Sequence, residues 1–436
     1  MKDMNKHTPE VKRWLRAGNP SRQFRWAALP AMILFAWGLW APNASALALR
    51  VPNQDASAIA RGNAFVATAD DPSAIYYNPS GITQLDGQNI QAGSLFYLGI
   101  YGDYNSPSGQ GIHNDAEVIP VPTLQYTLTP KEWPVSFGFG VYEPFGFSVE
   151  WPNDAPFRQE SLKGSLTYIT MNPIVAWKVL PSLSIVAGPT FNYSRIDLVY
   201  GLLPAPSPYF PADQSEFKGD GWSYGFNAGA LWQPHPQWSF GASYRSSSCM
   251  DYHGDFSVHD LPPTGLSSSA SGASSKLEAP QIVIGGISYR PTLKWNLEFD
   301  VDWADWTSVK NLAIQGATID GAPVPYNRTL DWQASFMYEV GVTRYFDNGY
   351  YLSAGYFYSE ASTSSLYFTP MVPDTDLHIG SLGGGYKGQT WSWALALQII
   401  GGGWRNVTAD PSVNQTVNGR YKLFTPTLSF SVGYHF

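Results

Sequence analysis

The C-terminal stretch TLSFSVGYHF, residues 427–436, decides the fold because its side chains alternate strictly between two kinds. In an extended chain one face is apolar throughout, with Leu428, Phe430 and Val432. The opposite face carries only small or polar side chains. A strand with an apolar outer face and a polar inner face is typical of a closed barrel in a lipid bilayer.

The same alternation recurs along the chain. It appears in WSWALALQI, residues 391–399, and in KWNLEFDVDWADW, residues 294–306, which sends a row of acidic side chains to the inner face. The predicted fold class is therefore all-β, a transmembrane antiparallel β-barrel of about 14 strands. We predict strands over 89–100, 120–129, 135–143, 166–179, 183–199, 221–233, 238–247, 279–290, 293–305, 331–345, 350–358, 377–387, 390–400 and 423–436.

The connections between these segments alternate between long and short. The short ones are TPKEWP, VLPS, QPHPQ, RPTL, FDNG and YKGQ, and the long ones begin near Tyr101, Pro144, Tyr200, Ser246, Trp306, Ser359 and Gly401. Outer-membrane barrels have short periplasmic turns and long extracellular loops. A soluble all-β domain has no reason to keep this alternation, so the pattern favours a barrel whose N-terminus lies in the periplasm.

The first 46 residues have the features of a secretory signal peptide. Seven basic residues precede an apolar run over 27–40, which is too short to cross a bilayer comfortably as a helix. Cleavage is expected near 46 or 48, since Ala44-Ser45-Ala46 and Ala46-Leu47-Ala48 both fit a peptidase site. The alternative is an uncleaved inner-membrane anchor. The remainder is expected to form a plug over 47–88 and the barrel over 89–436.

Composition agrees with an exported membrane barrel. The net charge is −8, which disfavours a nucleic-acid partner, and Cys249 is the only cysteine, so no intrachain disulfide can form. Aromatic residues make up 15% of the chain and charged residues only 14%. Aromatic side chains near strand ends are predicted to form interfacial girdles, with ordinary core packing as the alternative: Trp133, Trp151, Trp177, Trp238, Trp303 and Trp391.

Residues 47–88 do not alternate for long enough to form a membrane strand. A turn or helix-start signal lies at 70–73, a second turn at 78–81, a small-residue helix is expected over 57–62, and 74–77 is a short apolar patch. A compact segment of this kind is predicted to sit inside the lumen as a plug. Its gate residues are predicted to be Asp70, Asp71, Asn78, Pro79, Ser80 and Gly81.

The stretch RVPNQDASAIARGNAFVATADDPSAIYYNPSGITQLDG, residues 50–87, resembles the N-terminal hatch of the FadL/TodX (OMPP1) family of outer-membrane hydrophobe transporters. The family pattern A-x-A-D-D-x-S-A-x-x-x-N-P-A-G is matched from Ala67 to Gly81, with Ser80 in place of the usual Ala. Segments 142–158 and 218–246 extend the resemblance over most of the mature chain. It implies a plugged barrel that passes long-chain fatty acids, or aromatic or aliphatic hydrocarbons, inward without an energy source.

Candidate substrate contacts lie in the second and third long loops. The third loop is unusually apolar, and exposed apolar patches usually mark interaction sites; in the family, the corresponding loop helps to form the first capture site. The predicted apolar contacts, with loop-on-loop packing as the alternative, are Leu202, Leu203, Tyr209, Phe210, Phe217, Phe145, Phe147 and Phe157. Arg158 and Arg245 are candidate contacts for a carboxylate headgroup. The alternatives are a solvated Arg158 and pairing of Arg245 with Glu298 or Asp300.

Glycines in the third predicted strand suggest where a substrate leaves. Gly138 and Gly140 are expected to mark a bulge or bend. In the family, a kink in an early strand opens the wall beside the hatch, so the resemblance implies a lateral exit here. The inner acidic row of Glu298, Asp300 and Asp302 would repel anions. That favours uncharged hydrophobes over fatty acids, unless salt bridges in the lumen neutralise the row.

Three other functions remain as alternatives. A lipase or protease is disfavoured because no G-x-S-x-G or zinc motif occurs, and a polar porin is disfavoured by the plug. A surface adhesin or phage receptor with no transport role would also use long loops. We expect no enzyme activity, no cofactor and no metal. We also expect a monomer in the outer membrane of a Gram-negative bacterium that contacts lipid and lipopolysaccharide, assembled by machinery that reads Phe436.

Overall fold

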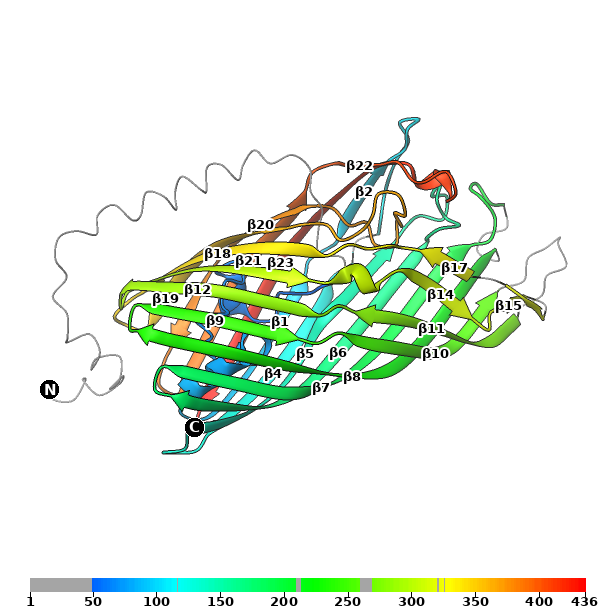
Figure 1. Ribbon diagram of the computed structural model, residues 1–436. Coiled ribbons are helices and arrows are strands. Elements are labelled where there is room, and N and C mark those ends of the chain that lie inside the picture. Colours follow the sequence, from blue (N-terminus) through cyan, green and yellow to red (C-terminus); the bar gives the residue numbers. More distant parts are fainter. Residues whose placement is uncertain (1–48, 116, 209–212, 259–268, 320, 325) are drawn as a thin grey trace.

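The computed structural model describes residues 49–115, 117–208, 213–258, 269–319, 321–324 and 326–436. It consists of a closed antiparallel β-barrel of 14 strands with a compact N-terminal segment inside it (Figure 1). The predicted fold class is thereby confirmed. The predicted signal peptide lies outside the described residues.

The strands of the barrel wall follow one another in chain order. They are β1 (Gly87–Tyr97), β4 (Ile119–Thr129), β5 (Val135–Glu150), β6 (Lys163–Leu180), β7 (Leu183–Gly201), β8 (Gln214–His235), β9 (Trp238–Arg245), β12 (Ile282–Thr292), β13 (Trp295–Ala304), β18 (Ser335–Tyr345), β19 (Tyr350–Ser359), β20 (Leu377–Lys387), β21 (Trp391–Gly402) and β23 (Gly419–His435). Each pairs antiparallel with the next, and β23 pairs with β1 to close the barrel. Short connections lie at the end that holds the C-terminus, called the turn end, and long ones at the opposite loop end (Figure 1).

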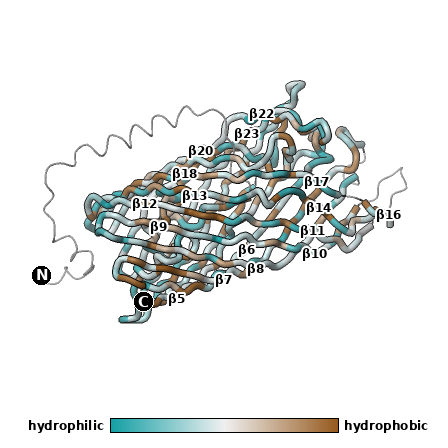
Figure 2. Tube along the Cα trace, viewed as in Figure 1, coloured by the Kyte–Doolittle hydropathy of each residue, from teal (hydrophilic) through white to brown (hydrophobic). Residues whose placement is uncertain are grey.

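The middle of the wall places apolar side chains outward. In β21, Leu395, Leu397 and Ile399 are 48–58% exposed, whereas Ala394 and Ala396 on the inner face are buried. Figure 2 shows hydrophobic positions spread along the strands of the wall. Lipid replaces water around this surface, so the exposed apolar side chains carry no cost. Among the described residues, no helix is long and apolar enough to cross a membrane.

The alternation reverses at the loop end, where the wall continues beyond its apolar band. In β10 (Ser248–Val258), Met250 and Tyr252 point inward and are buried, while Asp255 is exposed on the outer face. Water surrounds this part of the wall, so charge faces outward and apolar groups fill the interior. The predicted long connection that begins near Ser246 is therefore largely strand, because β10 and β11 (Ser269–Ala279) extend the wall there.

Shorter elements complete the loop end. They are β2 (Tyr101–Asn105), β3 (Gly111–His113), β14 (Asn311–Gln315), β15 (Thr318–Ile319), β16 (Ala322–Pro323), β17 (Tyr326–Thr329), β22 (Arg405–Val407), η3 (Trp306–Ser308) and η4 (Gln415–Val417). The lumen at this end is filled by an apolar cluster, here called the loop-half cluster, which includes Leu198, Tyr200, Phe217, Tyr252, Trp306 and Trp332.

The N-terminal segment from Leu49 to Leu85, here called the hatch, fills the lumen nearer the turn end (Figure 1). It contains α3 (Ala56–Ile59), α4 (Ala74–Tyr77) and η2 (Pro79–Gln84), and most of its residues are buried. Such short helices are unstable alone, so the hatch depends on side-chain caps and on contacts with the wall. Asp55, for example, caps α3 by accepting the backbone N–H of Ser57.

Candidate functional site

The turn at 78–81 ties the two halves of the hatch to each other and to the wall. Asn78 Nδ2 donates to the carbonyl of Val66 at 2.8 Å and to the carbonyl of Ala230, in β8, at 3.0 Å. Gly81 has no room for a side chain, because an added Cβ would lie 2.2 Å from the carbonyl oxygen of Ala69. The turn is therefore tightly packed against the rest of the hatch and is hydrogen-bonded to β8 of the wall.

Two adjacent carboxylates of the hatch have opposite environments. Asp70 lies 2.9 Å from Lys387 Nζ and 3.6 Å from Arg290 Nη2. Burial alone would raise the pKa of Asp70, but the surrounding cations lower it to about 2. Asp71 accepts hydrogen bonds from two serine hydroxyls of the hatch, and burial together with nearby Asp55 raises its pKa to about 6. Asp70 thus joins the hatch to the wall, while Asp71 holds the hatch together.

The acidic row of β13 anchors the hatch. Glu298 and Asp300 accept the backbone N–H groups of residues 65–68 at 2.7–3.0 Å. Asp302 forms a buried ion pair with Arg50. The carboxylates of this row are engaged by the hatch, which corresponds to the alternative in which contacts inside the lumen neutralise them.

The barrel wall is interrupted between β4 and β5. The two strands pair only where Leu124–Leu128 lies opposite Phe137–Val141. Towards the loop end, β4 continues paired with β1 and β5 continues paired with β6, with no pairing recorded between them along these described strands. The register of β5 shifts between Tyr142 and Phe145, which is a bulge that bends the strand.

Gly138 and Gly140 do not mark this bend. Both lie in regular pairing with β4 and β6. A Cβ on Gly140 would lie 2.7 Å from Cγ2 of Ile75, and one on Gly138 would lie 3.2 Å from Cδ1 of the same side chain. The glycines therefore make room for the apolar patch of the hatch. The kink was predicted at these glycines, but the bend of β5 lies at residues 142–145.

The start of the hatch pairs with the edge of β5 near the interruption. The backbone N–H of Val51 donates to the carbonyl of Pro144 at 2.9 Å, and that of Gly146 donates to the carbonyl of Leu49 at 2.8 Å. Residues 49–51 thus serve as a short extra strand that covers backbone groups of β5 beyond its pairing with β4.

A cavity of about 470 Å³ opens at the interruption. β4 contributes Ile119 and Val121, β5 contributes Phe147 and Val149, and the hatch contributes Val51. The volume lies within the range of small-molecule pockets, which are usually apolar with a few polar groups.

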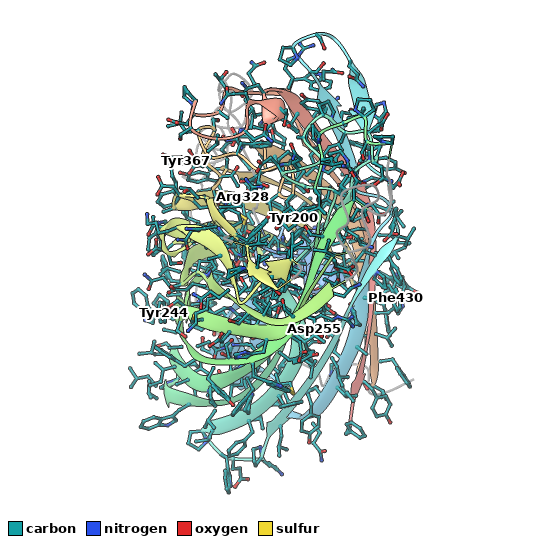
Figure 3. All side chains as sticks on the ribbon, turned by 90° about the vertical axis from the view of Figure 1, so that its right-hand side faces the viewer. Tyr200, Tyr244, Asp255, Arg328, Tyr367 and Phe430 are labelled. Atoms are coloured by element: carbon teal, nitrogen blue, oxygen red, sulfur yellow. The ribbon has the colours of Figure 1, made fainter. Side chains whose placement is uncertain are left out.

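A smaller cavity of about 40 Å³ adjoins it, because the two share Phe147 and Met371. Tyr200 lines this second cavity together with Arg328, whose guanidinium is 2.9 Å from Glu160. Figure 3 views the molecule from the loop end and places Tyr200 and Arg328 within the ring of strands. An apolar lining therefore extends from the loop half of the lumen to the interruption.

The predicted apolar contacts fall into different places. Phe147 lines both cavities. Three others are buried in apolar clusters: Phe145, Phe157 and Phe217. Two are half-buried at the third loop: Leu202 and Leu203. The remaining two lie outside the described residues: Tyr209 and Phe210.

Reasoning from sequence missed the contribution of β4. Its start, IPVPT at residues 119–123, carries Pro120 and Pro122, and Pro120 lines the larger cavity. Proline has no N–H to donate and is confined to strand positions without a pairing partner on that side. Two prolines at alternate positions were the signal for an unpaired edge.

The two arginines proposed for a headgroup are already engaged. Arg158 is fully buried, with Nη2 3.1 Å from Asp213 Oδ1, so it cannot meet an incoming carboxylate without breaking this pair. Arg245 donates to the hydroxyl of Tyr142 at 2.9 Å and lies 5.0 Å above the ring of Tyr76. Both arginines were expected to contact a carboxylate headgroup, but the structure engages Arg158 with Asp213 and Arg245 with Tyr142. The alternative partners of Arg245, Glu298 and Asp300, instead accept backbone N–H groups of the hatch.

A multi-pass barrel with an apolar outer band and an N-terminal hatch defines a plugged channel of the outer membrane of Gram-negative bacteria. The chain matches the family described as outer membrane protein transport protein (OMPP1/FadL/TodX) over residues 38–396. It belongs to this family, whose members transport hydrophobic compounds rather than act as enzymes. The predicted resemblance is confirmed.

Relatives and solved structures agree with this assignment. A long-chain fatty acid transport protein of Escherichia coli O6:H1 is 22% identical over 346 residues, covering 71% of this chain and 76% of that protein. A 47 kDa outer membrane protein of Pasteurella multocida is 23% identical, covering 80% and 85%. The fold is similar to a Pseudomonas aeruginosa FadL homologue (TM-score 0.77, 19% identity, 89% and 100% covered) and to the Pseudomonas putida toluene transporter TodX (0.67, 16%, 88% and 98%).

Proposed function

We propose that this chain is a passive channel for hydrophobic small molecules, either long-chain fatty acids or aromatic or aliphatic hydrocarbons. A substrate is captured at the loop end, enters the apolar half of the lumen, and leaves sideways between β4 and β5 when the hatch moves. One observation carries the proposal: the interrupted strand pairing, the cavity of about 470 Å³ and the hatch strand at residues 49–51 all meet at the same place.

The apolar lining supports a route without an energy source. Each Å² of apolar surface kept from water contributes about 25 cal/mol, so a hydrophobe prefers the loop-half cluster to the medium. From there the adjoining cavities continue to the wall, and lipid lies beyond. Movement from water to lipid is favourable throughout, and the channel only has to bypass the polar surface of the membrane.

The hatch contacts suggest how the route opens. Residues 49–51 are held to β5 by two backbone hydrogen bonds, each contributing about 1 kcal/mol net. Residues 65–68 are held more strongly by two buried carboxylates. We therefore expect the first residues of the hatch to detach from β5 while the remainder stays docked, so the wall opens but the barrel does not become a wide pore.

A reversible cross-link between hatch and wall tests the proposal. A Cβ on Gly146 would lie 3.8 Å from Cγ2 of Val51, so Val51→Cys with Gly146→Cys places two thiols within bonding reach. The native thiol is first removed by Cys249→Ser. We expect toluene uptake by cells to fall about tenfold on oxidation and to recover with reductant, while each single-cysteine variant is unaffected. Normal uptake by the cross-linked protein would rule out this gate.

The proposal also covers the surroundings of the barrel. We propose that the protein is a monomer, that it contacts lipopolysaccharide, and that the assembly machinery recognises Phe436. Phe436 is 73% exposed, which leaves the side chain available to a partner.

A further inference from the structure

The larger cavity has an acidic lining. Its charged residues, among those that the structure describes, are Arg50, Glu117, Glu143 and Asp374. Arg50 is neutralised by its buried ion pair with Asp302, which is not part of the lining. Three carboxylates and one occupied cation therefore belong to a lining that is otherwise uncharged and largely apolar.

The three carboxylates of the lining differ in whether they already have hydrogen-bond partners within the protein. Asp374 Oδ2 accepts the backbone N–H groups of Ser362 at 2.9 Å and Thr363 at 3.1 Å, so it has a structural role in its loop. The side chains of Glu117 and Glu143 have no hydrogen bond or ion pair within the part of the chain that the structure describes. Their charge is therefore directed at whatever occupies the cavity.

Glu143 stands where the hatch meets the interrupted wall. Its carbonyl accepts from Gln54 Nε2 at 2.7 Å, and its N–H donates to Gln54 Oε1 at 3.3 Å. The backbone is thus clamped by the hatch through main-chain atoms, inside the bulge of β5. The side chain takes no part in this clamp, so a change at its end does not disturb the backbone.

We propose that Glu143, assisted by Glu117, excludes anionic amphiphiles from the lateral route, so that the transported molecules are uncharged hydrophobes such as alkyl aromatics or alkanes. The inference rests on the proposed exit between β4 and β5 and names its substrate class. A fatty-acid anion entering the cavity would bring a further carboxylate beside Glu143, whose half-buried position lowers the screening of the repulsion below that in bulk water. A hydrocarbon carries no charge, so it packs against the apolar part of the lining without this repulsion.

Paired uptake measurements test the inference. Cells carrying the full chain as their only hydrophobe transporter are given radiolabelled toluene or laurate at pH 7.5. For the native chain we expect toluene uptake well above that of cells without the chain, and little laurate uptake. Glu143→Gln is expected to raise laurate uptake about tenfold, the effect of removing one unit charge within several ångström at an intermediate dielectric, and Glu117→Gln with Glu143→Gln further. The measured quantity is the ratio of laurate uptake to toluene uptake, which is expected to rise by the same factor.

A matched control and a folding assay make the outcomes distinct. Asp220→Asn removes the same charge from an exposed outer position on β8 and is expected to change neither uptake. Heat-dependent gel mobility reports that each variant is a folded barrel. Laurate uptake by the native chain equal to that of toluene, or no rise in the folded Glu143→Gln variant, would overturn the inference while leaving the channel intact. Absence of both uptakes in the native chain would overturn the proposed function itself.

Discussion

The two halves of the lumen are held by different kinds of force. At the loop end, a cluster that includes Phe217 and Trp306 packs apolar side chains together. At the turn end, the hatch is fastened by buried carboxylates such as Asp300, by the ion pair of Asp70 with Lys387, and by the turn at 78–81. Apolar packing is non-directional, which suits the capture of hydrophobes proposed for this end. Polar contacts are directional, so they define one docked position for the hatch, as the proposed gate requires.

This difference predicts that substitutions in the loop-half cluster lower the stability of the barrel. Substitutions at the hatch contacts are predicted to affect the closure of the channel instead. The largest effect is expected from Phe217→Ala in the loop-half cluster, where the side chain is fully buried. Loss of a buried phenyl ring should lower the free energy of unfolding by about 3–5 kcal/mol, measured by urea titration in detergent micelles. The lipid-facing Phe226→Ala on the same strand, at a position 51% exposed, is the control and should cost far less. Ion conductance should be unchanged in both, and a leaky Phe217→Ala channel would show that the halves are not independent.

An intermediate effect is expected at the turn end from Asp300→Ala. The variant leaves the buried N–H groups of Phe65 and Val66 without an acceptor, which costs about 3 kcal/mol of hatch docking. Ion conductance in planar bilayers should therefore rise, whereas the midpoint of barrel unfolding should move little. The control is Asp255→Ala, an exposed carboxylate of β10. Equal conductance of the two variants would show that the acidic row does not hold the hatch.

The smallest effect is a pH dependence of hatch docking that comes from Asp71. Its pKa is raised to about 6 in the folded hatch, so the protonated form is favoured by folding. Docking is therefore expected to be strongest below pH 4 and to weaken by about 2 kcal/mol as the pH rises through 6. Asp70, with its pKa lowered to about 2, stays ionised across this window and adds no slope. Channel openings in bilayer recordings should become more frequent from pH 5 to pH 7, and Asp71→Asn should remove the trend. An equal trend in that variant would assign the effect to another group.

The sequence could predict most features of the barrel wall that depend on local pattern. The period-two alternation in 391–399 and 427–436 identified membrane strands because neighbouring side chains face opposite sides of a strand whatever its partner is. Alternating loop lengths gave the orientation of the strands, and the stretch 50–87 indicated a hatch. The same logic failed at 248–258, where the alternation is equally clear but the outer face meets water, so strands were taken for a loop.

Only the tertiary structure decided which groups meet. Glu298, Asp300 and Asp302 are recognisable as inward-facing in the sequence, but their partners lie more than two hundred positions away in the hatch. The buried Arg158–Asp213 pair and the contact of Gly140 with Ile75 were hidden for the same reason. Alternation assigns a side chain to a face, whereas closure of the barrel and docking of the hatch determine what lies opposite that face. The interruption between β4 and β5, where the proposed exit lies, is a property of pairing and belongs to the assembled barrel.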